Sequence, residues 1–427
     1  MFVVLPVIRR LLANPIVLWV VFLAVHVWLG YDGLHHPSMP FGDVTNVYHD
    51  WVQQWLDGDR LGIDEPWVYP ILAIVPMLAA LVLGLDQYGI GWMVIVTLAD
   101  AVIFAYLIWR IRPGGAGRTA RLSAAWWWLL FLLLLGPVAV GRIDIFVVDL
   151  VIAGLLVVAS RPALAGVLLA LATWMKVWPA AIIVGVVLAV RRRMRVMVAA
   201  GITLVGVLVL ALLLGAGLNA FSFITEQTGR GLQIEAPFAS IWLWLAYAGQ
   251  GQVYYSHEIL TFQVTGPGSD LIATLTTPLL VVAVAAVLLV AFLVVRRGGS
   301  PTAVLPPLAL ALVTSLMVFN KVGSPQFVGW LAAPVILGIV TLGRRFFVPA
   351  LLVLLEAGLT QIIYPIGYDE ILGLDPVMLT VLTLRNVLTV VLFGYAIVLL
   401  WQSGRARGDR HPGGADHVVG ESSRPVA

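Results

Sequence analysis

Long apolar segments constrain the fold of this chain more than any other feature of its sequence. A helix needs about 20 apolar residues to cross the hydrocarbon of a bilayer, and segments of about that length recur throughout the chain. Because hydrocarbon offers no hydrogen-bonding partners, the backbone of such segments must form helices. The twelve predicted spans cover residues 13–31, 69–85, 90–109, 123–138, 142–159, 163–190, 196–215, 271–295, 302–319, 326–342, 346–364 and 376–401. They predict an all-α polytopic membrane protein.

The composition supports this class and excludes others. Of 427 residues, 61% are hydrophobic and 11% are charged, whereas a soluble protein carries roughly 25% charged residues. The net charge of +3 comes from basic residues at span ends, so it indicates no nucleic-acid partner. The absence of cysteine excludes disulfides, thiol catalysis and cysteine-bound metal. The first span follows Arg9 and Arg10 but is too long for a signal-peptide core, so we expect it to be a membrane helix.

Basic clusters between the spans predict the orientation, because they mark cytoplasmic ends. With the N-terminus inside, both termini are cytoplasmic, and the two long polar loops, residues 32–68 and 216–270, lie outside the plasma membrane. The clusters that agree are at residues 9–10, 191–195, 296–297, 344–345 and 405–407. A further cluster falls outside in this scheme, and placing it inside would require one span before it and one after it not to cross. Its members are Arg110, Arg112, Arg118 and Arg121.

The domain organisation follows from the spans. Residues 1–401 are expected to form one integral membrane domain. Residues 402–427 are rich in Gly, Arg and Pro without periodicity, which predicts a disordered cytoplasmic tail. The absence of an internal repeat argues against a transporter, since many transporter folds contain one.

The first long loop contains a carboxylate beside an amphipathic segment. Val44, Val47, Trp51 and Trp55 have the spacing of a short helix lying in the membrane interface, with tryptophan anchors. Asp43 stands just before this helix. One interpretation is a helix N-cap, and the other is a general base at the membrane surface, whose pKa burial would raise.

The second long loop contains Arg230 between two glycines, followed by Gln233 and Glu235. An uncrowded guanidinium suits a phosphate or a sugar diol. The alternative is an Arg230–Glu235 pair that only folds the loop. A third polar segment, residues 319–327, includes Lys321 and Gln326. Lys321 is expected either to hold a phosphate or to extend to the lipid headgroups as an ordinary interfacial lysine.

Several charged residues lie inside predicted spans. Burying a charge in hydrocarbon is costly, so these side chains should face the bundle interior or a cavity. Pro179 should break the helix near Lys176, which would then face a cavity or pair with Asp100 or Asp149. The histidines lack metal-ligand spacing, so no metal site is predicted. The set comprises Asp100, Asp144, Asp149, Lys176, Glu356 and Arg385.

Together, these segments resemble glycosyltransferase family 87, which comprises GT-C-type membrane enzymes that use polyprenyl-phosphate sugars. The resemblance runs over most of residues 13–345. The chain departs from the family pattern after Tyr69, where one proline replaces the usual two, and between Asp43 and Tyr48, where four residues replace three. The segments that carry the resemblance are Asp43 to Tyr48, Trp67 to Pro70, Gly166 to Pro179, Arg230 to Glu235 and Asn320 to Gln326.

The resemblance implies a GT-C-like bundle with a catalytic acid in the first outer loop and a second large loop after the seventh span. It implies Asp43 as the catalytic base of an inverting transfer, with Asp64 and Glu235 as the next candidates. Lys321 and Arg230 would stabilise the leaving phosphate. The expected substrate-binding residues are Tyr48, Asp64, Tyr69, Lys176, Arg230, Gln233, Glu235, Lys321 and Gln326.

The resemblance also implies the function. The expected activity moves mannose from a polyprenyl-phosphate donor to a glycolipid or cell-envelope glycan on the extracytoplasmic face. No cofactor is required in this scheme, although some related enzymes use a divalent ion. Arabinofuranosyl transfer by the same mechanism is the closest alternative. A lipid-sugar flippase would use the same basic groups without a poised carboxylate, and a membrane scaffold would give Lys176 and Asp149 only a packing role.

Overall fold

The computed structural model describes residues 11–109, 117–226, 230–257 and 261–404. Most of the predicted disordered tail therefore lies outside the described residues. Eight helical segments in the described part are long and apolar enough to cross a membrane, which confirms the all-α polytopic membrane class. They are Pro15–His35, Leu85–Trp109, Arg118–Ala139, Arg193–Leu213, Ser269–Arg296, Pro301–Val318, Pro325–Ile366 and Pro376–Gln402.

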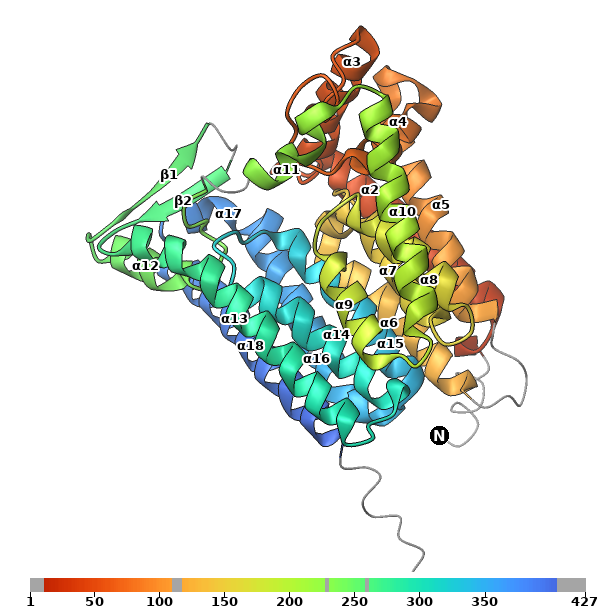
Figure 1. The fold of residues 1–427 in the computed structure, drawn as a ribbon. Coiled ribbons are helices and arrows are strands. Elements are labelled where there is room, and N and C mark those ends of the chain that lie inside the picture. Colours follow the sequence, from red (N-terminus) through yellow and green to blue (C-terminus); the bar gives the residue numbers. More distant parts are fainter. Residues whose placement is uncertain (1–10, 110–116, 227–229, 258–260, 405–427) are drawn as a thin grey trace, which may run out of the picture.

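The helices form one bundle with polar loops, short helices and a hairpin gathered at one end (Figure 1). We call this end the loop end, because it holds the segment from Asp43 to Pro70 and the loop between α10 and α13. The bundle helices are α2 (Pro15–His35), α5 (Tyr88–Trp109), α6 (Arg118–Leu135), α7 (Asp144–Val157), α8 (Pro162–Thr173), α9 (Pro179–Ala189), α10 (Arg193–Leu213), α13 (Ser269–Arg296), α14 (Pro301–Val318), α15 (Ala332–Leu342), α16 (Phe347–Gln361) and α18 (Pro376–Gln402).

Burial separates the interior helices from those that face lipid. Almost every side chain of α14 is buried, as are most of α7 and α15, so these helices form the core. In contrast, α10 and α13 expose rows of leucine, isoleucine and valine along most of their length. Because lipid tails are as apolar as these side chains, burying them would gain little, and their exposure is expected on the outside of a membrane bundle.

The segment predicted as the second span, residues 69–85, does not cross the bundle. It folds as α4 (Ile74–Ala79) between two short 3-10 turns, because Pro70 and Gly84 bound it. Its helical residues, Ile71–Leu83, pack against α5. The hydroxyl of Tyr88, at the start of α5, donates to the Met77 carbonyl at 2.9 Å. Residues 69–85 therefore fold back at the loop end, and the predicted crossing is wrong.

The segment predicted as one span at residues 163–190 is two helices, α8 and α9, which pack against each other and against α10. They are joined by a turn at residues 174–178, and Pro179 begins α9. The Leu72 amide donates to the Trp174 carbonyl at 3.0 Å, which places this turn at the loop end. The chain therefore rises to the loop end in α8 and returns in α9.

These two changes move the discordant arginine cluster to the other end of the bundle. The Trp126 indole donates to the Leu12 carbonyl at 2.9 Å, so α6 starts beside the beginning of α2. Arg121 lies over the ring of Tyr106, near the end of α5. Arg118 and Arg121 thus lie opposite the loop end, contrary to the prediction, whereas Arg110 and Arg112 lie outside the described residues. The fold of residues 69–85 removes one pass along the bundle and the α8–α9 turn adds one, so the number of passes stays even.

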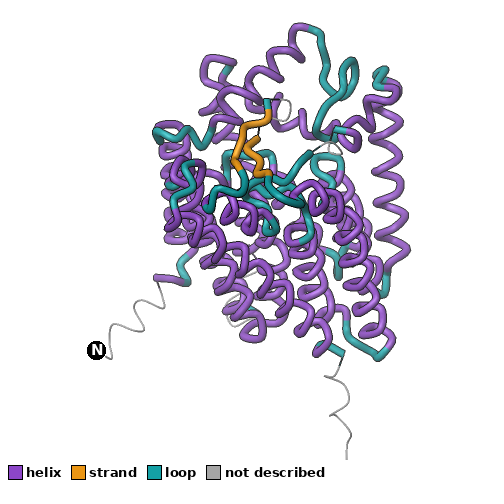
Figure 2. Tube along the Cα trace, turned by 90° about the vertical axis from the view of Figure 1, so that its left-hand side faces the viewer, coloured by secondary structure: helices purple, strands orange, loops and turns teal. Residues whose placement is uncertain are grey.

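The loop between α10 and α13 contains two short helices, α11 (Ser222–Thr225) and α12 (Ala239–Tyr247), and an antiparallel hairpin (Figure 2). Strands β1 (Gln252–Ser256) and β2 (Thr261–Thr265) pair from Gln252↔Thr265 to Ser256↔Thr261. Both strands are rich in aromatic and β-branched residues, which favour extended structure. This hairpin was not predicted from the sequence.

Five of the six charged residues predicted inside spans are buried, and Lys176 is half-buried. Asp100 accepts a hydrogen bond from Trp128 at 2.8 Å and lies 3.0 Å from His26, while Glu356 accepts one from Thr389 at 2.6 Å. Pairing satisfies part of the cost of removing such groups from water. The carboxylate oxygens of Asp149 have no hydrogen-bond partner among the described residues.

Candidate active site

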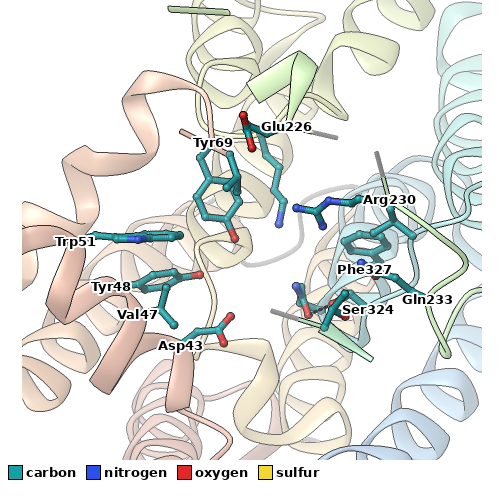
Figure 3. A pocket seen from close by; sticks show the side chains of 15 residues that line it. Asp43, Val47, Tyr48, Trp51, Tyr69, Glu226, Arg230, Gln233, Ser324 and Phe327 are labelled. Carbon is teal, nitrogen blue, oxygen red and sulfur yellow. Dashed lines mark hydrogen bonds between the residues drawn. The ribbon is translucent and has the colours of Figure 1, made fainter. Parts of the chain in front are cut away.

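A cavity of about 260 Å³ opens at the loop end, and we call it the central cavity (Figure 3). Its walls come from the first loop, the α8–α9 turn, the loop after α10, the hairpin and the segment after α14. Segments distant in sequence therefore converge on one polar space. Seven of the predicted site residues line it: Asp43, Tyr48, Tyr69, Lys176, Arg230, Gln233 and Gln326.

Asp43 opens a short π-helical segment, Asp43–Tyr48, that continues into α3 (His49–Asp57). Gly42 occupies the cap position, and no side chain makes a capping hydrogen bond there. The N-cap interpretation of Asp43 is therefore wrong. Instead, the carboxylate accepts from the Arg142 guanidinium, with Nε 2.9 Å from Oδ2. The Asp43 side chain is 40% exposed, so it remains accessible from the cavity.

Arg142 is the main site residue that the sequence reasoning missed. It is buried, and it donates to the carbonyls of Pro40 and Gly141 at 2.8 Å and to the Tyr364 hydroxyl at 3.2 Å. Burial alone would lower the pKa of Arg142, but the charge of Asp43 and the nearby Tyr364 raise it overall. Its signal in the sequence is a single arginine in the turn before α7. This turn lies at the loop end, whereas the described arginine clusters lie at the opposite end of the bundle.

Lys176 pairs with a carboxylate other than those predicted. Its Nζ lies 2.6 Å from Oδ2 of Asp144, and Oδ1 of the same carboxylate accepts from the Trp330 indole at 2.6 Å. Pairing with Asp100 or Asp149 is wrong, because the α8–α9 turn carries Lys176 to the loop end, where α7 begins with Asp144. The ammonium also lies 5.3 Å from the ring centroid of Tyr69, within the range of a cation–π interaction.

Arg230 projects into the central cavity from the loop after α10 (Figure 3). Its Nε is buried and has no hydrogen-bond partner among the described residues. Burial lowers the pKa of Arg230 and also that of Lys321, which the charge of Arg230 lowers further. The alternative Arg230–Glu235 pair is not formed, since Glu235 pairs with Arg385 at 3.2 Å.

A second space, the apolar groove, has a volume of about 570 Å³ and runs between α9, α13 and α14. Apolar side chains such as Val177, Trp178 and Leu316 line most of it, and Lys321 lies on its wall. The groove shares Tyr69 and Lys176 with the central cavity. The apolar groove therefore meets the central cavity at Lys176.

A third space, the tyrosine chamber, has a volume of about 240 Å³ and is lined by Tyr255, Tyr364 and Tyr368. Asp43 and Gln326 line both this chamber and the central cavity, so Asp43 lies on their common wall. Arg142 and Glu235 also line the chamber.

Close backbone approach between two segments sets the geometry of this common wall. A Cβ at Gly323 would overlap the backbone of Glu235 and Ala236, so only glycine permits this approach. Burial raises the pKa of Glu235 to about 7, and the Arg385 guanidinium partly offsets that rise.

Asp64 and Tyr48 differ from the other predicted site residues in their surroundings. Asp64 lies outside the three spaces, is exposed, and accepts from Arg60 at 2.8 and 3.0 Å. Tyr48 reaches the central cavity, but its ring is buried against Trp51 and Trp92 and its hydroxyl accepts from the Ile143 amide. No group of three His, Asp or Glu residues in the described part of the chain is arranged to hold a metal ion.

The fold and the site define a membrane protein whose polar cavity at one end of the bundle meets an apolar groove between helices. Residues 67–251 match the family model of glycosyltransferase family 87. This match confirms the resemblance over these residues, and it supports a glycosyltransferase activity for this membrane protein. The matched region contains Tyr69, Arg142, Lys176 and Arg230, whereas Asp43 lies before it. No curated protein and no solved structure matches the chain.

Proposed function

We propose that this glycosyltransferase moves mannose from a polyprenyl-phosphate donor to a glycolipid or cell-envelope glycan, with inversion. The observation that carries the proposal is the meeting of three spaces around two charged groups. Lys176 stands where the apolar groove joins the central cavity, and Asp43 stands between the central cavity and the tyrosine chamber. A donor with a long apolar tail and an anionic head fits the first junction, and an acceptor hydroxyl fits the second.

The donor would lie with its polyprenyl chain in the apolar groove. Its phosphate would then face Lys176 and Arg230, with Lys321 on the groove wall beside them. A guanidinium with an unpartnered buried Nε is a suitable donor for a phosphate oxygen, because charge-assisted hydrogen bonds are stronger than neutral ones. The sugar would occupy the central cavity.

The reaction is a direct displacement. The Asp43 carboxylate takes the proton of an acceptor hydroxyl, whose oxygen forms a bond to the anomeric carbon. The bond from that carbon to the phosphate oxygen breaks, and the lipid phosphate leaves with the electron pair. Lys176, Arg230 and Lys321 stabilise its charge. Arg142 keeps the Asp43 carboxylate oriented, and the exposed part of that side chain remains open to the acceptor.

The distribution of arginines supports an extracytoplasmic site and cytoplasmic termini in the plasma membrane. Arg118 and Arg121 join the other described span-end clusters opposite the loop end, so no described cluster now opposes the positive-inside rule. The arginines at the loop end stand singly, and two of them, Arg60 and Arg142, are paired with the carboxylates of Asp64 and Asp43.

The decisive experiment is transfer by purified protein in detergent or proteoliposomes. Labelled polyprenyl-phosphate mannose and the corresponding arabinofuranose donor are supplied with a glycolipid extract as acceptor. Transfer from the mannose donor is expected, and Asp43→Asn is the inactive control. Transfer from the arabinofuranose donor alone would reassign the sugar. Movement of the donor across the bilayer without transfer would replace the enzyme with a flippase.

A further inference from the structure

A further space lies at the end of the bundle opposite the loop end, and we call it the basal pocket. Its volume is about 540 Å³. Its walls come from the start of α14, the turn Gly343–Phe346, the start of α16 and the end of α18, which packs against both α14 and α16 (Figure 1). None of the described residues that line it also lines the central cavity, the apolar groove or the tyrosine chamber. The basal pocket is therefore separate from the candidate active site.

The turn between α15 and α16 places two adjacent arginines on this pocket. Gly343 ends α15 with a φ of 55°, a conformation that glycine adopts readily and other residues rarely. Phe346 is buried, and a Cβ at Gly338 would overlap its ring, so the ring lies directly against α15. Phe346 thereby fixes the turn, while Arg344 and Arg345 are exposed and line the pocket.

Four polar side chains around the basal pocket are available to a ligand. None of them forms a hydrogen bond or an ion pair with another described residue. A neighbouring arginine that does not line the pocket is engaged differently, since the Arg297 guanidinium lies 4.3 Å from the ring centroid of Trp401. The four available side chains are those of Arg344, Arg345, Tyr395 and Gln402.

The charge at this end of the bundle has one sign. The described turns and helix ends there contain arginines but no aspartate or glutamate, so no carboxylate in them neutralises Arg344 or Arg345. Two adjacent guanidiniums suit a phosphate, whose oxygens accept charge-assisted, bidentate hydrogen bonds. The segments compared are residues 11–14, 117–121, 158–163, 190–195, 296–303, 341–348 and 401–404.

The basal pocket changes from polar to apolar with depth. Gln402 lies at the end of α18, whereas Leu399 and Tyr395 lie further into the bundle on the same helix. Tyr395 stands two helical turns, about 10 Å, before Gln402. Leu342 and Val348 extend the apolar wall, and the Val348 side chain is 40% exposed. The deeper part of the pocket therefore opens to the lipid-facing surface and contains one hydroxyl.

A phospholipid presents the same order of chemistry, from the phosphate through the ester groups to the acyl chains. The pocket volume of about 540 Å³ lies within the roughly 300–1,000 Å³ of small-molecule sites. Basic pockets between membrane helices bind the headgroups of anionic lipids. A soluble anion would contact the arginines but would leave the Tyr395 hydroxyl and the apolar wall without a partner.

We propose that the basal pocket binds one anionic phospholipid from the leaflet at this end of the bundle. Its phosphate lies at Arg344 and Arg345, its ester region lies beside the Tyr395 hydroxyl, and its acyl chains follow Val348 and Leu399. The bound lipid joins the α15–α16 turn to the ends of α14 and α18, and so it stabilises the folded protein. This inference does not depend on the proposed mannosyl transfer, because the two sites share no residue.

The test measures lipid binding by the full chain in a neutral detergent. Dioleoyl phosphatidylglycerol and dioleoyl phosphatidylcholine are titrated separately, bound lipid is counted by native mass spectrometry, and Tm is followed. For the wild type we expect one phosphatidylglycerol to bind in preference to phosphatidylcholine. Saturation with phosphatidylglycerol should raise the Tm by about 2–4 °C. Equal binding of the two lipids would overturn the proposal.

The double variant Arg344→Gln, Arg345→Gln should bind phosphatidylglycerol about ten- to a hundred-fold more weakly, because charge-assisted hydrogen bonds to the phosphate are lost. Arg191→Gln with Arg192→Gln is the matched control. It removes the same charge from two adjacent exposed arginines at the same end of the bundle, outside the pocket. The control should bind as the wild type does. Equal weakening in both variants would assign the binding to a general attraction of the basic surface and overturn the proposal.

Tyr395→Phe tests the pocket without changing the charge. It should weaken phosphatidylglycerol binding about two- to ten-fold through the loss of one hydrogen bond, and leave the Tm without lipid unchanged. Affinity equal to that of the wild type would contradict the placement of the lipid in the pocket.

A soluble headgroup separates a lipid site from an anion site. Glycerophosphoglycerol, which lacks the acyl chains, and inorganic phosphate should not raise the Tm at the concentrations at which phosphatidylglycerol does. Equal protection by either would replace the phospholipid with a soluble anion and overturn the proposal. Absence of mannosyl transfer in all of these proteins would refute the proposed function and leave the lipid-binding result as measured.

Discussion

Replacement of Arg142 should lower both the stability and the activity of the protein, although Arg142 is not one of the proposed phosphate-binding residues. In Arg142→Gln, the Asp43 carboxylate loses its partner at 2.9 Å, and the carbonyls of Pro40 and Gly141 lose their donors. Breaking a buried ion pair costs about 3–5 kcal/mol. Because Asp43 is 40% exposed and water can solvate it, we expect a loss of unfolding free energy near the lower bound, about 3 kcal/mol.

The effect on activity should appear in kcat, because Arg142 orients the base and does not contact the donor phosphate in the proposed arrangement. We expect kcat to fall about ten- to a hundred-fold, as one to two lost charge-assisted hydrogen bonds imply. KM for the donor should change little. Arg142→Lys keeps the charge but cannot reproduce the planar set of donors, so it should rescue part of kcat.

The assay combines thermal unfolding in detergent with steady-state transfer. Arg60→Gln is the matched control. Arg60 pairs with Asp64 in the same loop as Asp43, but this pair lies on an exposed surface outside the three spaces. Exposed pairs contribute little, so this variant should behave like the wild type. An Arg142→Gln protein with normal kcat would refute the positioning role, and one with a raised donor KM alone would place Arg142 at the phosphate.

Three further predictions follow from the same geometry. Arg230→Ala should reduce kcat/KM for the donor about ten- to a hundred-fold through the loss of a charge-assisted hydrogen bond; unchanged use of the donor would place the phosphate elsewhere. The pKa of Glu235, about 7 against an ordinary 4.5, means that the folded state binds this proton more tightly. Its stabilising contribution is therefore full below about pH 4.5 and lost as the pH rises through 7, so the Tm of Glu235→Gln should vary less than that of the wild type over this interval. In this cysteine-free chain, Asp64→Cys should react with an impermeant thiol reagent in intact cells and Arg193→Cys should not; the reverse pattern would invert the proposed orientation.

Apolar length predicted the class of fold but not which segments cross. Residues 69–85 and 163–190 both have the hydropathy of spans, yet prolines and the turn at 174–178 divide them. The sequence contains these breaks, but whether a broken segment turns back depends on what it packs against. For Leu72, that partner is the Trp174 carbonyl, about a hundred residues away.

Site residues that stand in polar segments were predicted from the sequence, whereas a site residue next to an apolar span was missed. Asp43, Arg230 and Gln326 were recognisable because they stand in polar segments, and the structure brings them to one cavity. Arg142 was hidden at the edge of an apolar run. The partner of Lys176 was wrong because pairing inside a bundle depends on the relative height of helices, which hydropathy does not specify. The hairpin was missed because short strands give a weak signal beside spans of about 20 residues.

The central claim is that Asp43 is the base of the transfer, and Asp43→Asn tests it most directly. The amide keeps the size of the side chain and an oxygen that can still accept from Arg142, while it removes the basicity of the carboxylate. No capping bond is lost, because Asp43 makes none. General-base catalysis contributes about 10²–10⁴-fold, so transfer of labelled mannose should fall by at least about 100-fold while the protein still binds polyprenyl phosphate. Turnover close to that of the wild type would contradict the account.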